Sequence, residues 1–151
     1  MSRVRILGIG SPSGDDQAGW LTVDALLAAG LDEIDVVKLD RPGANLIPLL
    51  EGASRVILID AMQSHGSAGE IQRFDQKDWP SYCHGLSSHG FGVVAALMLA
   101  RELGSLPPRL DLYGIEIGSV CPGESAGDEV QAAAQRLAEM IVGSLEKDEA
   151  A

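Results

Sequence analysis

Short apolar runs alternate with segments of helical periodicity along most of the chain. The apolar runs are rich in Val, Ile and Leu and predict buried strands at residues 4–9, 34–39, 56–59 and 110–117. Residues 70–74 alternate between apolar and polar side chains, which is typical of an edge strand. Helical spacing and capping residues predict helices at residues 15–30, 45–50, 90–103 and 129–145, with an irregular stretch at 79–88.

This alternation of strands and helices predicts the fold class. It is typical of a three-layer αβα fold around a mostly parallel central sheet, here of about five strands. We expect a single domain over residues 1–146 and a frayed tail at residues 147–151, because a length of 151 residues fits one domain. Ligands bind beyond the carboxyl ends of the strands in such sheets, so the residues directly after each strand are the candidate functional residues.

Composition and charge exclude several classes of protein. The 11 Lys+Arg against 22 Asp+Glu give a net charge of −11, which argues against a nucleic-acid partner because phosphate binding needs clustered basic residues. The longest apolar stretch, residues 93–100, is far shorter than the roughly 20 residues of a membrane helix, and no signal-peptide pattern is visible. Cys83 and Cys121 are too few for a disulfide scaffold. We therefore expect a soluble, cytoplasmic protein without a membrane partner.

The glycine-rich segment from Gly8 to Gly14 invites comparison with a dinucleotide-binding loop. The spacing fails, because Ser13 stands where the third glycine of that motif belongs. Asp15 and Asp16 also occupy the helix start at which a pyrophosphate would bind, so no nucleotide cofactor is expected. Both acids favour the positive end of the helix dipole, and this is the whole role expected of Asp15.

Three polar residues lie just after a predicted strand or at the start of a predicted helix, namely Asp16, Asp60 and His89. Alone, Asp60 would equally suit a loop cap. Two carboxylates that converge on one crevice share a proton or bind a cation, and a histidine at a helix start is favoured in its neutral, metal-binding form. An Asp/Asp/His set suits a divalent metal such as Zn, Ni, Co or Mn. His65 lies in a Ser-His-Gly-Ser segment and is expected to be solvated.

The order and separation of these motifs resemble those of the hydrogenase maturation endopeptidases, over nearly the whole chain. The resemblance is carried by Gly8-Ile9-Gly10-Ser11-Pro12, Gly14-Asp15-Asp16, Gly19, Ile59-Asp60-Ala61 and Ser88-His89-Gly90. It implies that Asp16, Asp60 and His89 contact a metal and that Asp40 is the family's additional acid.

The chain departs from the family pattern in three places. Ser11 stands where Asn is common, the loop before the acid pair is one residue shorter, and Asp40-Arg41-Pro42-Gly43 replaces a frequent Asp-Gly-Gly-Thr. These changes bear on the identity of the substrate more than on the chemistry, because the three metal-contacting positions are kept.

The resemblance implies an endopeptidase that removes the C-terminal peptide of a nickel-loaded hydrogenase large-subunit precursor. The nickel then belongs to the substrate and is recognised by Asp16, Asp60 and His89. In one mechanism the nickel polarises the scissile carbonyl or a water while a carboxylate moves the proton. In the other, which is metal-independent and of the aspartyl-protease type, Asp16 or Asp40 acts as the base. Two alternative functions use the same crevice: a non-catalytic metal-binding module or nickel-site chaperone, and a small-molecule hydrolase.

Overall fold

The computed structural model describes residues 3–11, 14–31, 34–40, 44–63, 66–79, 88–117 and 126–150. Its centre is a five-stranded sheet with the strand order β2-β1-β3-β5-β4. Four strands run parallel, β1 (Val4–Gly10), β2 (Asp35–Asp40), β3 (Arg55–Met62) and β5 (Arg109–Glu116). The edge strand β4 (Ile71–Phe74) is antiparallel to β5. The predicted sheet of about five mostly parallel strands is therefore confirmed.

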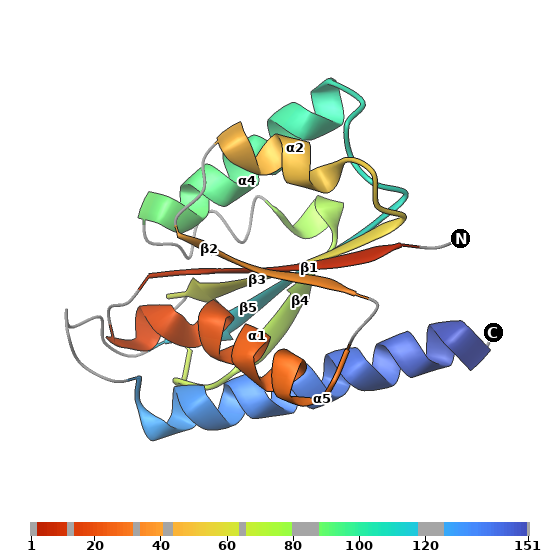
Figure 1. The fold of residues 1–151 in the computed structure, drawn as a ribbon. Coiled ribbons are helices and arrows are strands. Elements are labelled where there is room, and N and C mark those ends of the chain that lie inside the picture. The colour runs from red at the N-terminus through yellow and green to blue at the C-terminus, as the bar shows by residue number, and fades with distance from the viewer. Residues whose placement is uncertain are drawn as a thin grey trace.

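Helices cover both faces of this sheet (Figure 1). One face carries α1 (Ala18–Ala28) and α5 (Asp128–Ala150), and the other carries α2 (Ile47–Leu50) and α4 (Ser88–Glu102). Short 3₁₀ turns complete the described elements: η1 (Gly14–Gln17), η2 (Ala44–Leu46) and η3 (Gln76–Asp78). No described helix combines the length and the apolar character that crossing a bilayer requires. The three-layer αβα architecture is the predicted one.

The central strand β3 shows how the sheet divides the core into two halves. All eight of its residues are buried, as expected for a parallel strand covered on both faces. Leu58 and Met62 pack in the cluster that contains the α4 residues, whereas Ile57 and Ile59 pack in the cluster formed with α1 and α5. Because side chains alternate along a strand, Asp60 shares the α4-facing side with Leu58 and Met62.

Several element boundaries differ from those that the sequence predicts. The strand expected at residues 56–59 continues through Asp60 to Met62, because β5 pairs with it as far as the Met62–Glu116 register. The last helix, expected to end near residue 145, continues to Ala150, since residues 146–150 contain no Gly or Pro to stop it. The short helix expected at residues 45–50 begins later, because residues 44–46 form η2, and the N-cap of α2 is Leu46 without a side-chain cap bond.

Candidate active site at the carboxyl edge of the sheet

The candidate site lies where β1 and β3 end. In the strand order, β2 lies on one side of β1 while β3 and β5 lie on the other, so the direction of winding reverses between β1 and β3. Such a switch point is where open α/β sheets place their ligand crevice. Figure 1 shows that α1, α4 and α5 all begin at this edge, on the left of the view.

Two glycines allow η1 and α1 to lie directly on the ends of β1 and β3. A Cβ atom on Gly19 would overlap the backbone of Ile9 and would lie 2.7 Å from the carbonyl oxygen of Ile59. A Cβ on Gly10 would lie 2.6 Å from the carbonyl oxygen of Asp16. This close packing seats Asp16, one turn before Gly19, over the switch point.

Asp16 is a buried carboxylate held by the residue that follows β1. Its side chain belongs to η1, and the residue is only 2% exposed. The Ser11 hydroxyl donates a hydrogen bond to Asp16 Oδ2, and the Ser11 backbone N–H donates to the Asp16 carbonyl oxygen at 3.2 Å. Ser11 itself is fully buried, so both partners are removed from bulk water.

Asp60 reaches the same edge from β3. It is fully buried, and its Oδ1 accepts a hydrogen bond of 2.8 Å from the backbone N–H of Ala61. Gly19 contacts Ile59, the residue before Asp60, so the segment that carries Asp16 and the end of β3 are adjacent. The structure thus brings the η1 and β3 segments together, as the placement of the two acids at strand ends predicts.

His89 lies in the first turn of α4, at a helix start as the sequence predicts, although α4 begins at Ser88 rather than near residue 90. Its side chain lies outside the part of the chain that the structure describes, as do His65, Cys83, His84 and Cys121. Asp60 and α4 lie on the same side of the sheet. Among the side chains that are described, no group of three or more His, Cys, Asp or Glu is arranged to hold a metal ion. The three-residue metal set stays a prediction.

Asp40 is the exposed acid of the same edge. It ends β2 and pairs in register with Gly10, the last residue of β1. The Trp20 indole N–H donates a 3.0 Å hydrogen bond to the carbonyl oxygen of Leu39 and ties α1 to this end of β2. Asp40 therefore lies one strand away from the Ser11–Asp16 segment and, unlike Asp16, is open to solvent.

Two features of this edge were not predicted from the sequence. One is a second role for Asp15, and the other is a further buried acid, Glu116. Asp15 Oδ1 accepts a 2.6 Å hydrogen bond from the backbone N–H of Gly127, just before α5. Glu116 ends β5, is 1% exposed, and accepts a hydrogen bond at Oε1 from the Gly66 N–H at 3.2 Å. An acid at the carboxyl end of a strand is a recognisable signal, and Glu116 escaped it because the predicted strand ran one residue further.

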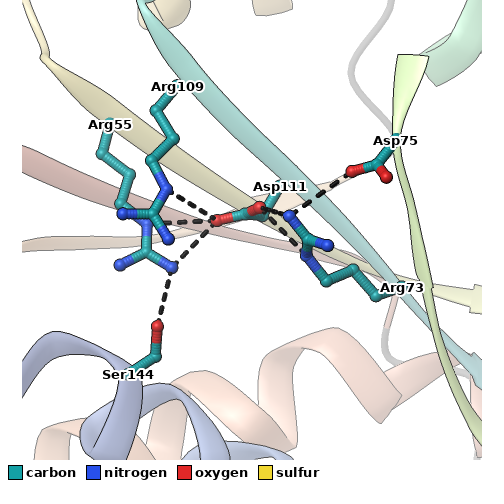
Figure 2. A network of polar contacts seen from close by, with 6 residues as sticks. All are labelled: Arg55, Arg73, Asp75, Arg109, Asp111 and Ser144. Carbon is teal, nitrogen blue, oxygen red and sulfur yellow. Dashed lines mark hydrogen bonds and ion pairs between the residues drawn. The ribbon is translucent and has the colours of Figure 1, made fainter. Parts of the chain in front are cut away.

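A second buried charge cluster lies at the opposite end of β5, around Asp111 (Figure 2). Arg55 Nη2 lies 2.9 Å from Asp111 Oδ2 and also donates to the Ser144 hydroxyl of α5 at 3.0 Å. Arg73 Nη2 lies 2.6 Å from Asp111 Oδ1, and Arg109 Nε lies 4.0 Å from Oδ2. One carboxylate thus joins β3, β4, β5 and, through Arg55, α5.

The cluster shifts the ionisation of its members in opposite directions. Burial alone would raise the pKa of Asp111, but the hydrogen bonds from Arg73 and Arg55 and their positive charges outweigh it and lower the pKa. The hydrogen bond to Asp111 raises the pKa of Arg73. Burial, together with the negative charge of Asp111, raises the pKa of Tyr113. These shifts keep the ion pairs charged, so this cluster is structural rather than a source of a catalytic acid or base.

Comparison with known proteins identifies the family. The sequence profile of the HycI family, described as hydrogenase maturation protease, matches residues 27–144, a stretch that contains Asp40, Asp60 and His89 and begins after Asp16. The hydrogenase maturating endopeptidase HybD from E. coli has a similar fold, with a TM-score of 0.85, 22% identity, and coverage of 97% of this chain and 93% of that chain. The [NiFe] hydrogenase maturation protease HybD from Thermococcus kodakarensis gives a TM-score of 0.77 at 25% identity, covering 93% of this chain and 97% of that chain. No protein with a curated description matches the sequence significantly.

Proposed function

The chain belongs to the hydrogenase maturation proteases, and from this premise we propose that it removes the C-terminal peptide of a nickel-loaded hydrogenase large-subunit precursor. It is a hydrolase of the endopeptidase class, as its family and its structural neighbours are. The proposal adds the substrate and the means of recognition. Asp16, Asp60 and His89 contact the nickel that the precursor carries.

One observation carries this proposal: two carboxylates from adjacent segments are both buried at the carboxyl edge of the sheet, where β1 and β3 end. Asp16 is 2% exposed and Asp60 is fully buried, and Gly19 packs the segment of the first against the strand of the second. Buried like charges are costly unless a cation or a shared proton compensates them. A metal ion brought by the substrate adds positive charge beside these acids in the complex, and in this way the site distinguishes a loaded precursor from an empty one.

The donor set agrees with the chemistry of nickel. Two carboxylates and an imidazole suit a borderline divalent metal and leave positions open for ligands from the precursor. The protease contributes three contacts and the precursor keeps the remaining ones. Nickel is accordingly a part of the substrate in this proposal and not a resident cofactor of the protease.

Asp40 suits the proton transfer because it is exposed and lies at the same edge. During hydrolysis a water oxygen adds to the scissile carbonyl carbon, and the C–N bond breaks. Asp40 accepts the proton that the water loses and returns it to the departing amine, so that the carboxylate is regenerated. The nickel polarises the carbonyl or the water. Asp16, which is buried and held by Ser11, serves the metal contact.

The experiment compares two forms of one purified precursor, nickel-loaded and nickel-free, incubated with the protease and analysed by mass spectrometry. Release of the C-terminal peptide from the loaded form alone supports the proposal. Cleavage of both forms at equal rates would mean a metal-independent mechanism that uses Asp16 or Asp40 as base. Binding without cleavage would indicate a nickel-site chaperone, and turnover of small esters or amides would indicate a small-molecule hydrolase.

A further inference from the structure

The side chain of Ser11 holds a proposed nickel contact, Asp16, in place. It is fully buried directly after β1, and its hydroxyl donates to Asp16 Oδ2. Its backbone N–H also donates to the Asp16 carbonyl oxygen at 3.2 Å. Ser11 therefore fixes both the main chain and the side chain of Asp16.

We infer that Ser11 is a positioning residue, which sets the orientation in which the Asp16 carboxylate meets the nickel of the precursor. The serine hydroxyl donates its one proton to Oδ2. This hydrogen bond fixes one oxygen of the carboxylate and so restricts the rotation of the group. Carboxylates that bind a metal are themselves held by hydrogen bonds, and loss of such a partner typically lowers metal affinity or activity by about 10–100-fold. Ser11 acts only through Asp16.

The main-chain bond separates this role from a folding role. Ser11→Ala keeps the backbone N–H that bonds to the Asp16 carbonyl oxygen and removes only the hydroxyl. The η1 segment is also held by the close packing of Gly19 and by the Asp15–Gly127 hydrogen bond. We therefore expect the variant to fold with Asp16 in place but without the hydrogen bond that orients its carboxylate from Ser11.

The inference rests on the proposed function, and the experiment is chosen to separate the two. Dissociation constants for nickel-loaded and nickel-free precursor are measured with the wild type, Ser11→Ala, Asp16→Ala and the double variant, all as full-length chains. We expect Ser11→Ala to weaken binding of the loaded precursor by about 10–100-fold and to leave binding of the nickel-free precursor unchanged. In the Asp16→Ala background the serine substitution has no further effect. Ser11→Thr, which keeps the hydroxyl, restores most of the lost affinity.

Any of four results decides against the inference or against the function on which it rests. If Ser11→Ala keeps the full preference for loaded precursor while Asp16→Ala loses it, the role of Ser11 is wrong and that of Asp16 stands. Equal weakening for both precursor forms, or an additive effect in the double variant, shows a general structural role. If Asp16→Ala also keeps the preference, nickel recognition by Asp16, and with it the proposed function, is wrong. Should Ser11→Ala fail to fold, Ser11→Cys, which fills the site with a weak donor, takes its place under the same criteria.

Discussion

Asp15 Oδ1 accepts a 2.6 Å hydrogen bond from the backbone N–H of Gly127, which joins residues 112 positions apart. The neighbouring acid, Asp16, bonds instead to Ser11, next to β1. The two adjacent acids thus have different tasks. Asp15 ties the start of α1 to the start of α5, whereas Asp16 belongs to the candidate site between β1 and β3.

Asp15→Ala is expected to lower stability. A hydrogen bond to a charged acceptor contributes about 1.5–3 kcal/mol, so we expect a loss of that size in the free energy of unfolding, measured with urea. This exceeds the roughly 0.3–1 kcal/mol that an acid at a helix start provides through the dipole alone. A loss below about 0.5 kcal/mol would mean that the Gly127 contact contributes little.

Asp16→Asn is expected to abolish processing, since it removes the charge of a proposed nickel contact. Asparagine keeps the size of the side chain and still accepts a hydrogen bond from Ser11, so the change isolates charge from shape. The matched control is Asp24→Asn, which changes the net charge of the protein by the same amount. Asp24 lies on the surface of α1 and pairs with Lys38 at 2.7 Å. The measurement is the fraction of nickel-loaded precursor trimmed at equal concentrations of folded enzyme. Equal activity of the two variants would rule out a metal contact at Asp16.

The fold was predictable because its signals are local. Apolar runs followed by helical periodicity identify parallel strands and their crossovers, and acids at strand ends point to the carboxyl edge. The role of Asp15 had no such signal, because its partner Gly127 is brought near only by the packing of α1 against α5. Asp111 lies inside a predicted buried strand, and its three arginine partners come from β3, β4 and β5. Contacts of this kind depend on strand order, which the local pattern does not determine.

His89→Ala is expected to stop processing with little loss of stability. If His89 contacts the nickel, its removal lowers the processing rate by more than the roughly 10–100-fold expected for a merely supporting residue. His65→Ala provides the control, because it removes the same kind of side chain at a position outside the proposed set. Thermal unfolding of both variants is followed alongside processing. A His89→Ala variant that no longer folds would show that this residue is structural.

The Asp111 cluster makes stability depend on acid pH. The pKa of Asp111 is lower in the folded protein than its ordinary value of 3.8, so its contribution is complete above that value and is lost as the pH falls through the lower, folded pKa. We expect Asp111→Asn to lower the free energy of unfolding by about 3 kcal/mol at pH 7, the lower end for a broken buried ion pair because Arg73 and Arg109 are half exposed. The difference in the free energy of unfolding between Asp111→Asn and the wild type becomes smaller as the pH falls below 3.8. Urea unfolding at several pH values measures it, with Asp75→Asn as an exposed control that changes stability by less than about 1 kcal/mol.

Gly19→Ala tests whether the close packing of α1 is what brings Asp16 to the end of β3. The added Cβ would overlap the backbone of Ile9 and lie 2.7 Å from the carbonyl oxygen of Ile59, and strands of a central sheet cannot yield as a flexible side chain would. We expect a loss of about 3 kcal/mol in the free energy of unfolding, at the upper end for overpacking. Gly143→Ala in α5 is the matched control. Apart from its chain neighbours and the backbone of its own helix, no atom of the described residues lies within 4 Å of its added Cβ, so the better helix propensity of alanine should stabilise the protein by about 0.5–1 kcal/mol.

The same pair of variants separates the position of Asp16 from global stability. At a temperature where both variants are fully folded, Gly19→Ala should still process nickel-loaded precursor more slowly than the wild type, because α1 must move away from β1 and β3 and carry η1 with it. Gly143→Ala should process at the wild-type rate. If folded Gly19→Ala processes at that rate as well, the spacing between the Asp16 segment and the end of β3 is not critical, and the shared site between Asp16 and Asp60 has to be abandoned.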